Sequence, residues 1–201
     1  MLTTRLDQDA RPRVLKHLLA LPSGDRRMRF GASVLDAASE GYVARLDFER
    51  DAVYGVCDAA LDLAGVTHVS LCDGVAEFGV SVLPGKRRQG IGTALISRAA
   101  LHARNQGVPL LFMQCLSENH AIIRIARSLG MRVVSFGPEC EASLPLRKGN
   151  AASWIQELFE DGIALCDYSL RAHFFPAPQC HTPLPRRSGN DERIAEDAKA
   201  A

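Results

Sequence analysis

A basic, glycine-bearing loop stands directly between a strand and a helix, and this junction constrains the fold more than any other part of the chain. Apolar and polar residues alternate from Val75 to Leu83, and Pro84 ends that strand. Residues 85–90 (GKRRQG) form the loop, and apolar residues at helical spacing predict a helix over 91–105. The N–H groups that open such a helix lack partners within it, and its dipole attracts negative charge. The junction therefore predicts a phosphate-binding site.

Three phosphate-binding patterns compete for this loop. A P-loop requires Lys and then Ser or Thr after its last glycine, but Ile91 follows Gly90. A dinucleotide fingerprint requires a third glycine where Leu95 stands, and its strand opens a parallel unit rather than an antiparallel meander. The third pattern, Arg/Gln-x-x-Gly-x-Gly/Ala after a strand ending in V-x-V-x-P, is matched in full by residues 80–84 and 87–92.

The remaining chain predicts helices on both faces of one mixed sheet. We expect a short edge strand over 2–6, helices over 9–21 and 33–46, a basic loop over 26–31, strands over 52–57, 61–72, 75–83, 109–116, 131–136 and 139–146, and helices over 91–105, from 119 to 129 and over 151–171. The meander followed by alternating strands and helices indicates an α/β (α+β) fold.

Length and composition set the organisation of the chain. Residues 1–175 form a single predicted domain, with its last helix at about 151–171. Residues 176–201 hold four of the ten prolines and few large aliphatic residues, which predicts a disordered tail. The 24 Lys and Arg residues against 23 Asp and Glu residues give no reason to expect nucleic-acid binding.

Other sequence features address location and metals. No apolar run is long enough for a membrane span, and the N-terminal residues do not form a secretory signal. Six scattered cysteines without a C-x-x-C pair favour neither a metal site nor a disulfide scaffold. We therefore expect a cytoplasmic protein without a bound metal.

The loop pattern and a second motif resemble the GCN5-related N-acetyltransferase (GNAT) superfamily. The second motif runs from Ser117 through Asn119 and Ala121 to Leu129-Gly130-Met131, and resembles the N-x-x-A…L-G-F/M helix of that family. The resemblance implies a mostly antiparallel central sheet that splays into a V between its fourth and fifth strands, with acetyl-CoA in the V. It implies direct transfer of the acetyl group to a primary amine of a small molecule or a protein lysine.

The resemblance also assigns contacts to acetyl-CoA. The strand before the loop would pair with the pantetheine arm, the loop and helix start would hold the pyrophosphate, and an Asn would contact the cofactor. The residues at these positions are Val80, Ser81 and Val82; Arg87, Arg88, Gln89, Gly90, Ile91, Gly92 and Thr93; and Asn119.

The catalytic acid and base cannot be carried over in the same way. Many family members have a Tyr seven residues after the motif Asn, where this chain has Ala126, and some have a carboxylate on the fifth strand, where this chain has Gln114. Glu77, on the strand that leads to the pantetheine segment, is the candidate base. His68 on the preceding strand is a second candidate, acting through a water. Cys115 lies in an apolar strand, which argues against a reactive thiolate.

The acceptor site is expected beside the basic loop. Arg26, Arg27 and Arg29 favour an acceptor with a carboxylate, and we take Arg29 and Phe30 as candidate substrate-binding residues. The stretch from Asp25 to Phe30 also resembles part of bacterial protein-lysine acetyltransferase domains. The alternatives are a solvated basic loop at this position, an acyl-CoA-binding sensor without efficient turnover, and a nucleotide-binding module. A homodimer through the last helix or a sheet edge also stays open.

Overall fold

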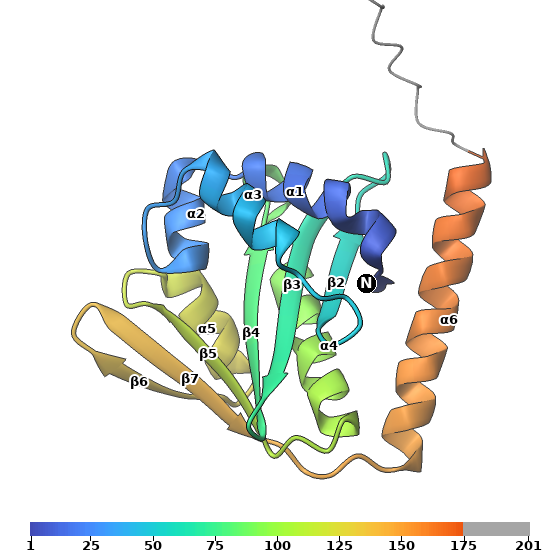
Figure 1. Cartoon of the computed structure of the whole chain (residues 1–201). Coiled ribbons are helices and arrows are strands. Elements are labelled where there is room, and N and C mark those ends of the chain that lie inside the picture. The colour runs from blue at the N-terminus through green and yellow to red at the C-terminus, as the bar shows by residue number, and fades with distance from the viewer. Residues whose placement is uncertain (175–201) are drawn as a thin grey trace, which may run out of the picture.

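The computed structural model describes residues 1–174, so the predicted tail at 176–201 lies outside the described residues. Its centre is a seven-stranded sheet in the order β1-β2-β3-β4-β5-β7-β6 (Figure 1). The strands are β1 (Thr4–Leu6), β2 (Ala52–Cys57), β3 (Leu63–Cys72), β4 (Val75–Val82), β5 (Leu110–Leu116), β6 (Arg132–Phe136) and β7 (Glu139–Pro145). The helices are α1 (Arg11–Leu19), α2 (Ser23–Phe30), α3 (Asp36–Ala44), α4 (Ile91–Asn105), α5 (His120–Ser128) and α6 (Ala151–Phe174), with 3-10 turns at Gln8–Ala10 and Pro84–Lys86.

The sheet opens between β4 and β5. Every other neighbouring pair is antiparallel, whereas β4 and β5 are parallel and pair only over Val75–Glu77 with Leu110–Phe112. Beyond Glu77, β4 keeps its partner β3 and β5 keeps its partner β7, so the two strands diverge (Figure 1). The predicted V between the fourth and fifth strands is therefore confirmed, and it leaves one edge of β4 without a neighbouring strand.

Two hydrophobic cores cover the two faces of the sheet. Alternate residues of β2 point in opposite directions, so Tyr54 packs with Leu95 and the rest of the α4 and α5 side, while Val53 packs with Val14 and Val43 on the α1 and α3 side. Both sets are almost fully buried. Helices on both faces of a mixed, mostly antiparallel sheet agree with the predicted fold class.

The predicted basic loop at 26–31 is wrong, because residues 23–30 form α2. The segment has few apolar residues and buries none of its side chains, so no hydrophobic periodicity reveals it. The carbonyl of Pro22 accepts the N–H groups of Asp25 and Arg26 and opens the helix, and Gly31 closes it at a φ of 76°. Helix α3 starts at Asp36 rather than Ser33: Leu35 is its N-cap residue, and no side chain caps the first turn.

Helix α6 extends to Phe174, beyond the predicted end at 171, and contacts the body with its polar side. Arg98 of α4, whose side chain is 1% exposed, lies 3.1 Å from Glu160 and 2.5 Å from Asp161. Glu157 lies 3.6 Å from Arg98 and also accepts a hydrogen bond from the Nδ1 of His102 at 3.0 Å. The outward side of α6 instead exposes the large apolar side chains of Trp154, Ile155, Leu158, Phe159, Ile163, Leu165 and Leu170. Within residues 1–174, no helix has the length and apolar character needed to cross a membrane.

Candidate functional site

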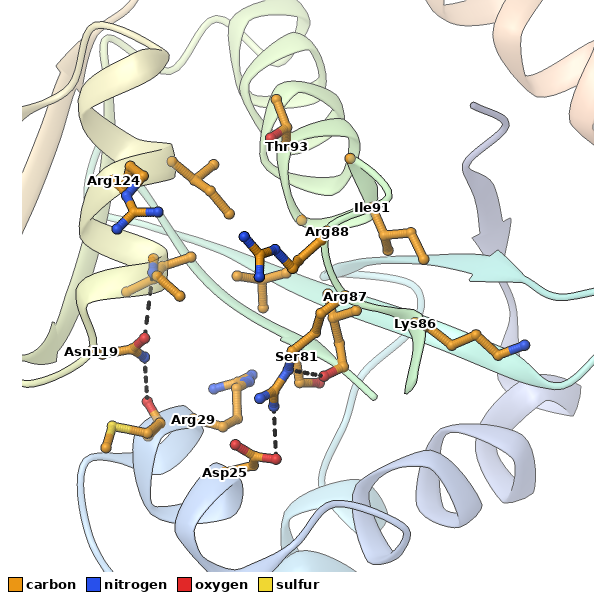
Figure 2. Close-up of a pocket in the computed structure, with 18 of the residues that line it drawn as sticks. Asp25, Arg29, Ser81, Lys86, Arg87, Arg88, Ile91, Thr93, Asn119 and Arg124 are labelled. Carbon is orange, nitrogen blue, oxygen red and sulfur yellow. Dashed lines mark hydrogen bonds and ion pairs between the residues drawn. The ribbon is translucent and has the colours of Figure 1, made fainter. Parts of the chain in front are cut away.

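A cavity of about 420 Å³ lies in the V, between β4, the start of α4, α2 and α5 (Figure 2). The structure brings together most of the residues that the sequence assigns to the cofactor. Those that line the cavity are Val80, Ser81, Val82, Arg87, Arg88, Gly90, Ile91, Gly92, Thr93 and Asn119. Gln89 is exposed and does not line it.

The start of α4 presents backbone N–H groups to this cavity. Gly90 is the N-cap at a φ of 80°, and no side chain caps the helix. Arg88 also has a positive φ, 62°, so successive peptide units turn through a left-handed step before the helix begins. Such a turn directs neighbouring N–H groups toward one point and forms an anion-binding concavity. The geometry suits a phosphate at the mouth of the helix.

Some of the cationic side chains around the cavity form ion pairs within the protein, and others do not. Arg87 lies 2.7 Å from Asp25, and its Nε donates to the carbonyl of Val82 at 3.3 Å. Lys86 is paired with Asp58 at 2.9 Å. Among the described residues, neither Arg88 nor Arg124 of α5 forms an ion pair, and Figure 2 shows both side chains beside the space between α4 and α5. These two guanidinium groups are available to an anionic ligand.

The inner wall of the cavity is the edge of β4. On its other side β4 pairs with β3, where Val80 lies opposite Thr67 and Val82 opposite Gly65. The Ser81 hydroxyl donates to Nε2 of His17 at 2.9 Å, and the His17 Nδ1–H donates to the carbonyl of Leu63 at 2.8 Å. Burial lowers the pKa of His17, which keeps the ring neutral in this role. The backbone of Val80–Val82 is thus held in place, with one edge facing the cavity.

Asn119, which also lines the first cavity, forms hydrogen bonds within the protein that hold two helices together. Its Oδ1 accepts the backbone N–H of Ile122 at 3.3 Å and so caps α5, and its Nδ2 donates to the carbonyl of Met28 at 3.5 Å (Figure 2). Asn119 therefore links α5 to α2 across the cavity, and both polar groups of its side chain have protein partners.

A second cavity, of about 480 Å³, shares one lining residue, Arg29, with the first. It brings together the remaining predicted residues, Arg29, Phe30, His68 and Glu77, with Tyr42 of α3. Glu77 is exposed and lies at the last pair between β4 and β5, opposite Phe112, where the strands part.

The three arginines of α2 are not equivalent. Arg26 pairs with Asp36 and Arg27 with Glu118, so both are engaged at the surface. Arg29 forms no ion pair within residues 1–174; its guanidinium lies over the rings of Phe30 and Tyr42, 5.1 and 5.5 Å from their centroids. Arg29 is therefore the arginine of this helix that faces both cavities.

Cys115 also lines the second cavity but is buried. Burial raises the pKa of its thiol to about 11, so the thiol is protonated at neutral pH. This agrees with the expectation that Cys115 is not a reactive thiolate.

Sequence reasoning missed three residues of the site. Tyr42 and Asp51 belong to a hydrogen-bond chain with His68, and Arg124 faces the first cavity. Arg124 lies five residues after the N-cap Asn119, and a basic residue this close to the motif Asn is a sequence signal that could have marked it as a cofactor contact. Tyr42 and Asp51 carry no local signal, because their role depends on elements that meet only in the folded chain.

The comparisons with known proteins agree with this geometry. The model of the acetyltransferase (GNAT) family matches residues 21–131. The chain is similar to the GNAT domain of S. lividans PAT, with 16% identity, a TM-score of 0.63, and coverage of 72% of this chain and 89% of that one. It is similar to yncA from Salmonella typhimurium, solved with its cofactor acetyl-CoA, with 20% identity, a TM-score of 0.56, and coverage of 75% and 96%.

A third similar structure is RimL, a ribosomal L7/L12 α-N-protein acetyltransferase solved with coenzyme A. The identity is 13%, the TM-score is 0.57, and the coverage is 72% of this chain and 93% of that one. No curated protein sequence matches the chain. At these identities the solved structures show the fold, and the family model, which spans more than half of the chain, shows the family. The protein belongs to the acetyltransferase (GNAT) family.

Proposed function

We propose that the protein transfers the acetyl group of acetyl-CoA directly to a primary amine. One observation carries this proposal: the strands β4 and β5 part after Glu77, the uncapped amides of α4 open into one cavity there, and Arg29 lines both this cavity and a second one that contains Glu77. In this proposal a single ligand places its phosphates at the helix and its thioester beside Arg29, next to the second cavity.

The donor half of the site suits acetyl-CoA in three respects. The free edge of Val80–Val82 can pair with the amides of pantetheine as an added strand would. The N–H groups from Arg88 to Thr93 suit the pyrophosphate, and the unpaired Arg88 and Arg124 suit further phosphate oxygens. Direct transfer by this arrangement requires no metal.

The acceptor half is the second cavity. Arg29 offers a guanidinium to a carboxylate or another anionic group on the acceptor. The ring of Phe30 stacks against this guanidinium and holds it in place. Glu77, at the point where the strands part, is the proposed base that takes the proton of the ammonium form, so that a neutral amine reaches the thioester. A small molecule and a protein lysine both stay open as the acceptor. A cytoplasmic location is part of the same proposal.

The alternative is an acyl-CoA-binding sensor without efficient turnover. Two residues motivate it. Ala126 is fully buried in α5 and has no proton to donate to the thiolate. Gln114 stands where some family members have a carboxylate base, and it hydrogen-bonds Glu139 at 3.1 Å. Both functions predict acetyl-CoA binding, so turnover separates them.

The test is release of CoA from acetyl-CoA over a panel of amino acids, polyamines, aminoglycosides and lysine peptides. We expect transfer to at least one amine, and a loss of more than tenfold in Glu77→Gln. Acetyl-CoA binding without any transfer would favour the sensor. Thermal stabilisation by ATP or NAD, but not by acetyl-CoA, would contradict both functions and leave a nucleotide-binding module.

A homodimer through α6 is proposed on separate grounds. The exposed apolar side chains of α6, from Trp154 to Leu170, form an outward stripe, while Glu157, Glu160 and Asp161 turn toward Arg98. A partner surface that complements it must itself be apolar and uncharged, and the same stripe of a second copy meets this condition. Because the charged side of α6 already holds the helix to Arg98, the stripe can pair without disturbing that contact.

A further inference from the structure

Four side chains from separate segments form one chain of hydrogen bonds beside the two cavities. Nε2 of His68 on β3 lies 2.8 Å from Oδ2 of Asp51, which directly precedes β2. Nδ1 of His68 lies 2.8 Å from the hydroxyl of Tyr42 on α3. Nη2 of Arg29 on α2 donates to the same hydroxyl at 2.9 Å. The side chains of His68 and Asp51 are only 17% and 18% exposed, so water competes little with their hydrogen bond.

The charges around His68 fix its protonation state. Burial lowers the pKa of His68, Asp51 counteracts this by hydrogen bond and charge, Arg29 lowers the pKa further, and Glu77 raises it. The net direction is down from 6.5, so the ring is neutral at neutral pH. These groups and Tyr42 are the titratable and charged groups that face His68 from α2, α3, β4 and the segment before β2.

The neutral ring sets the direction of every hydrogen bond in the chain. The carboxylate of Asp51 can only accept, so Nε2 of His68 carries the proton and Nδ1 has the lone pair. The Tyr42 hydroxyl therefore donates to Nδ1, while its oxygen accepts from the permanently charged Arg29. One lone pair of the Tyr42 oxygen is left over after these two hydrogen bonds. The order carboxylate, imidazole, hydroxyl is that of a catalytic triad, in which the hydroxyl proton can move to a neutral imidazole.

The hydrogen-bond chain lies beside the second cavity and ends at Arg29, which both cavities share. Tyr42 and His68 line the second cavity, and Arg29 lines both. His68 lies opposite Gly79 in the β3–β4 register, one residue before the proposed pantetheine segment. A reacting amine in the second cavity would thus approach the thioester beside the Tyr42 hydroxyl.

We infer that Tyr42, with His68 and Asp51 behind it, accepts the proton of the attacking amine and returns it to the sulfur of the departing CoA. The inference rests on the proposed acetyl transfer. As the amine nitrogen bonds to the thioester carbon, its proton moves to the Tyr42 oxygen while the Tyr42 proton moves to Nδ1 of His68. Asp51 and the resulting imidazolium form an ion pair. When the carbon–sulfur bond breaks, the proton returns by the same path to the thiolate, and the protein ends as it began. Glu77 neutralises the ammonium form before the attack, and Tyr42 handles the second proton, which the amine nitrogen loses as it bonds to carbon. Tyr42 is thus a second catalytic residue, and His68 and Asp51 are positioning residues.

The test compares variants on the best acceptor from the amine panel, with acetyl-CoA binding measured in parallel. Tyr42→Phe keeps the ring that packs edge-on against Phe30, so we expect an intact fold and an unchanged acetyl-CoA Kd. We expect kcat to fall about 100-fold, a size typical of lost acid–base catalysis. Tyr168→Phe on α6 is the matched control and should leave kcat unchanged. Turnover that survives Tyr42→Phe overturns the relay alone, whereas acetyl-CoA binding without transfer to any amine overturns the proposed function.

Two readouts separate a relay from a structural role. Asp51→Asn should move the acidic limb of the kcat/KM profile to lower pH and Arg29→Met to higher pH, since these residues shift the pKa of His68 in opposite directions. The double variant Tyr42→Phe/His68→Gln should be no slower than the slower single variant, since the two act as a unit. The relay would be contradicted if the rate losses of the two single variants multiplied in the double variant, or if the acidic limb of the kcat/KM profile did not move.

A third readout needs no acceptor. Imidazole ¹⁵N NMR of the intact protein at pH 7.5 should show His68 with a proton on Nε2 and none on Nδ1. A charged ring, or a proton on Nδ1, would overturn the assignment even if no amine in the panel reacts.

Discussion

The guanidinium of Arg29 occupies the space that a side chain at residue 79 would need. A Cβ built on Gly79 would lie 2.3 Å from both Cζ and Nη1 of Arg29. Gly79 thus leaves room for the Arg29 guanidinium against β4, and this guanidinium belongs to the residue that lines both cavities. The same guanidinium donates to the Tyr42 hydroxyl, so the space left by Gly79 also positions the last donor of the hydrogen-bond chain.

Gly79→Ala should therefore impair acetyl transfer without unfolding the protein. The new methyl group meets the flexible end of Arg29, which can swing away at little cost to stability, but it then leaves Tyr42 and the acceptor cavity. We expect an unchanged acetyl-CoA Kd and a loss of about tenfold in kcat/KM for the acceptor, the loss of one charged hydrogen bond. Gly24→Ala in α2, which meets open space, is the control. An equal loss of kcat/KM in both variants would contradict a specific role for Gly79 in positioning Arg29.

Gly90→Ala should weaken both the fold and acetyl-CoA binding. Residue 90 has a φ of 80°, where an L side chain costs about 1–2 kcal/mol. We expect Tm to fall by about 2–8 °C, and acetyl-CoA to bind more weakly because the amides of α4 are displaced. Gly85→Ala in the same loop meets open space at an ordinary φ and should change neither quantity. Thermal unfolding measures the Tm of both variants, and calorimetric titration measures their affinity for acetyl-CoA.

Stability should fall in acid through Glu157. Burial alone would raise the pKa of this carboxyl, but hydrogen bonds from His102 and Asn105 and the charges of His102 and Arg98 outweigh it and lower the pKa to about 2. A carboxyl with a lowered pKa stabilises the fold above its unfolded value of 4.5, and this contribution is lost as pH falls toward 2. The shift corresponds to a loss on the order of 3 kcal/mol.

Urea unfolding of the wild type and Glu157→Gln from pH 7 to pH 2 measures this contribution. Other carboxyls titrate in the same range, so the quantity of interest is the difference between the two proteins. The wild type should be more stable at pH 7 and should lose that advantage between about pH 5 and pH 2. A difference that does not vary with pH would show that Glu157 acts by packing rather than charge.

Leu158→Asp should dissociate a dimer that forms through α6. Leu158 is 69% exposed in the middle of the apolar stripe, so the charge does not disturb the core of one copy but would be buried between two. Leu35→Asp is the matched control, since Leu35 is 81% exposed and lies at the start of a different helix, α3. Sedimentation equilibrium should give a dimer for the wild type and the control and a monomer for Leu158→Asp. A monomeric wild type at micromolar concentration would contradict the proposal.

The elements that sequence predicts well are those with a strong period and clear ends. Strand β2 and helix α4 have the predicted bounds, because alternation or helical spacing runs between turn residues. Helix α2 was hidden, because a helix that buries no side chain leaves no apolar period. Its prediction as a loop placed Arg26, Arg27 and Arg29 together, whereas the helix directs only Arg29 to both cavities.

The candidate site divides in the same way. Its donor half is a continuous motif, so a pattern of spaced residues locates it. Its acceptor half is assembled from α2, α3, β3 and β4, and the partners Tyr42 and His68 are 26 residues apart in the chain. No local pattern relates them, since their contact depends on the packing of α3 against the sheet.

The most direct test of the central claim is a ¹H–¹⁵N NMR titration of the full chain with acetyl-CoA. The account predicts the largest shifts at the amides of Gly90, Gly92 and Thr93 and along Val80–Val82, with equal concentrations of ATP producing weaker shifts confined to the start of α4. Unchanged amides at these positions while acetyl-CoA binds elsewhere, or the absence of any binding, would contradict the account.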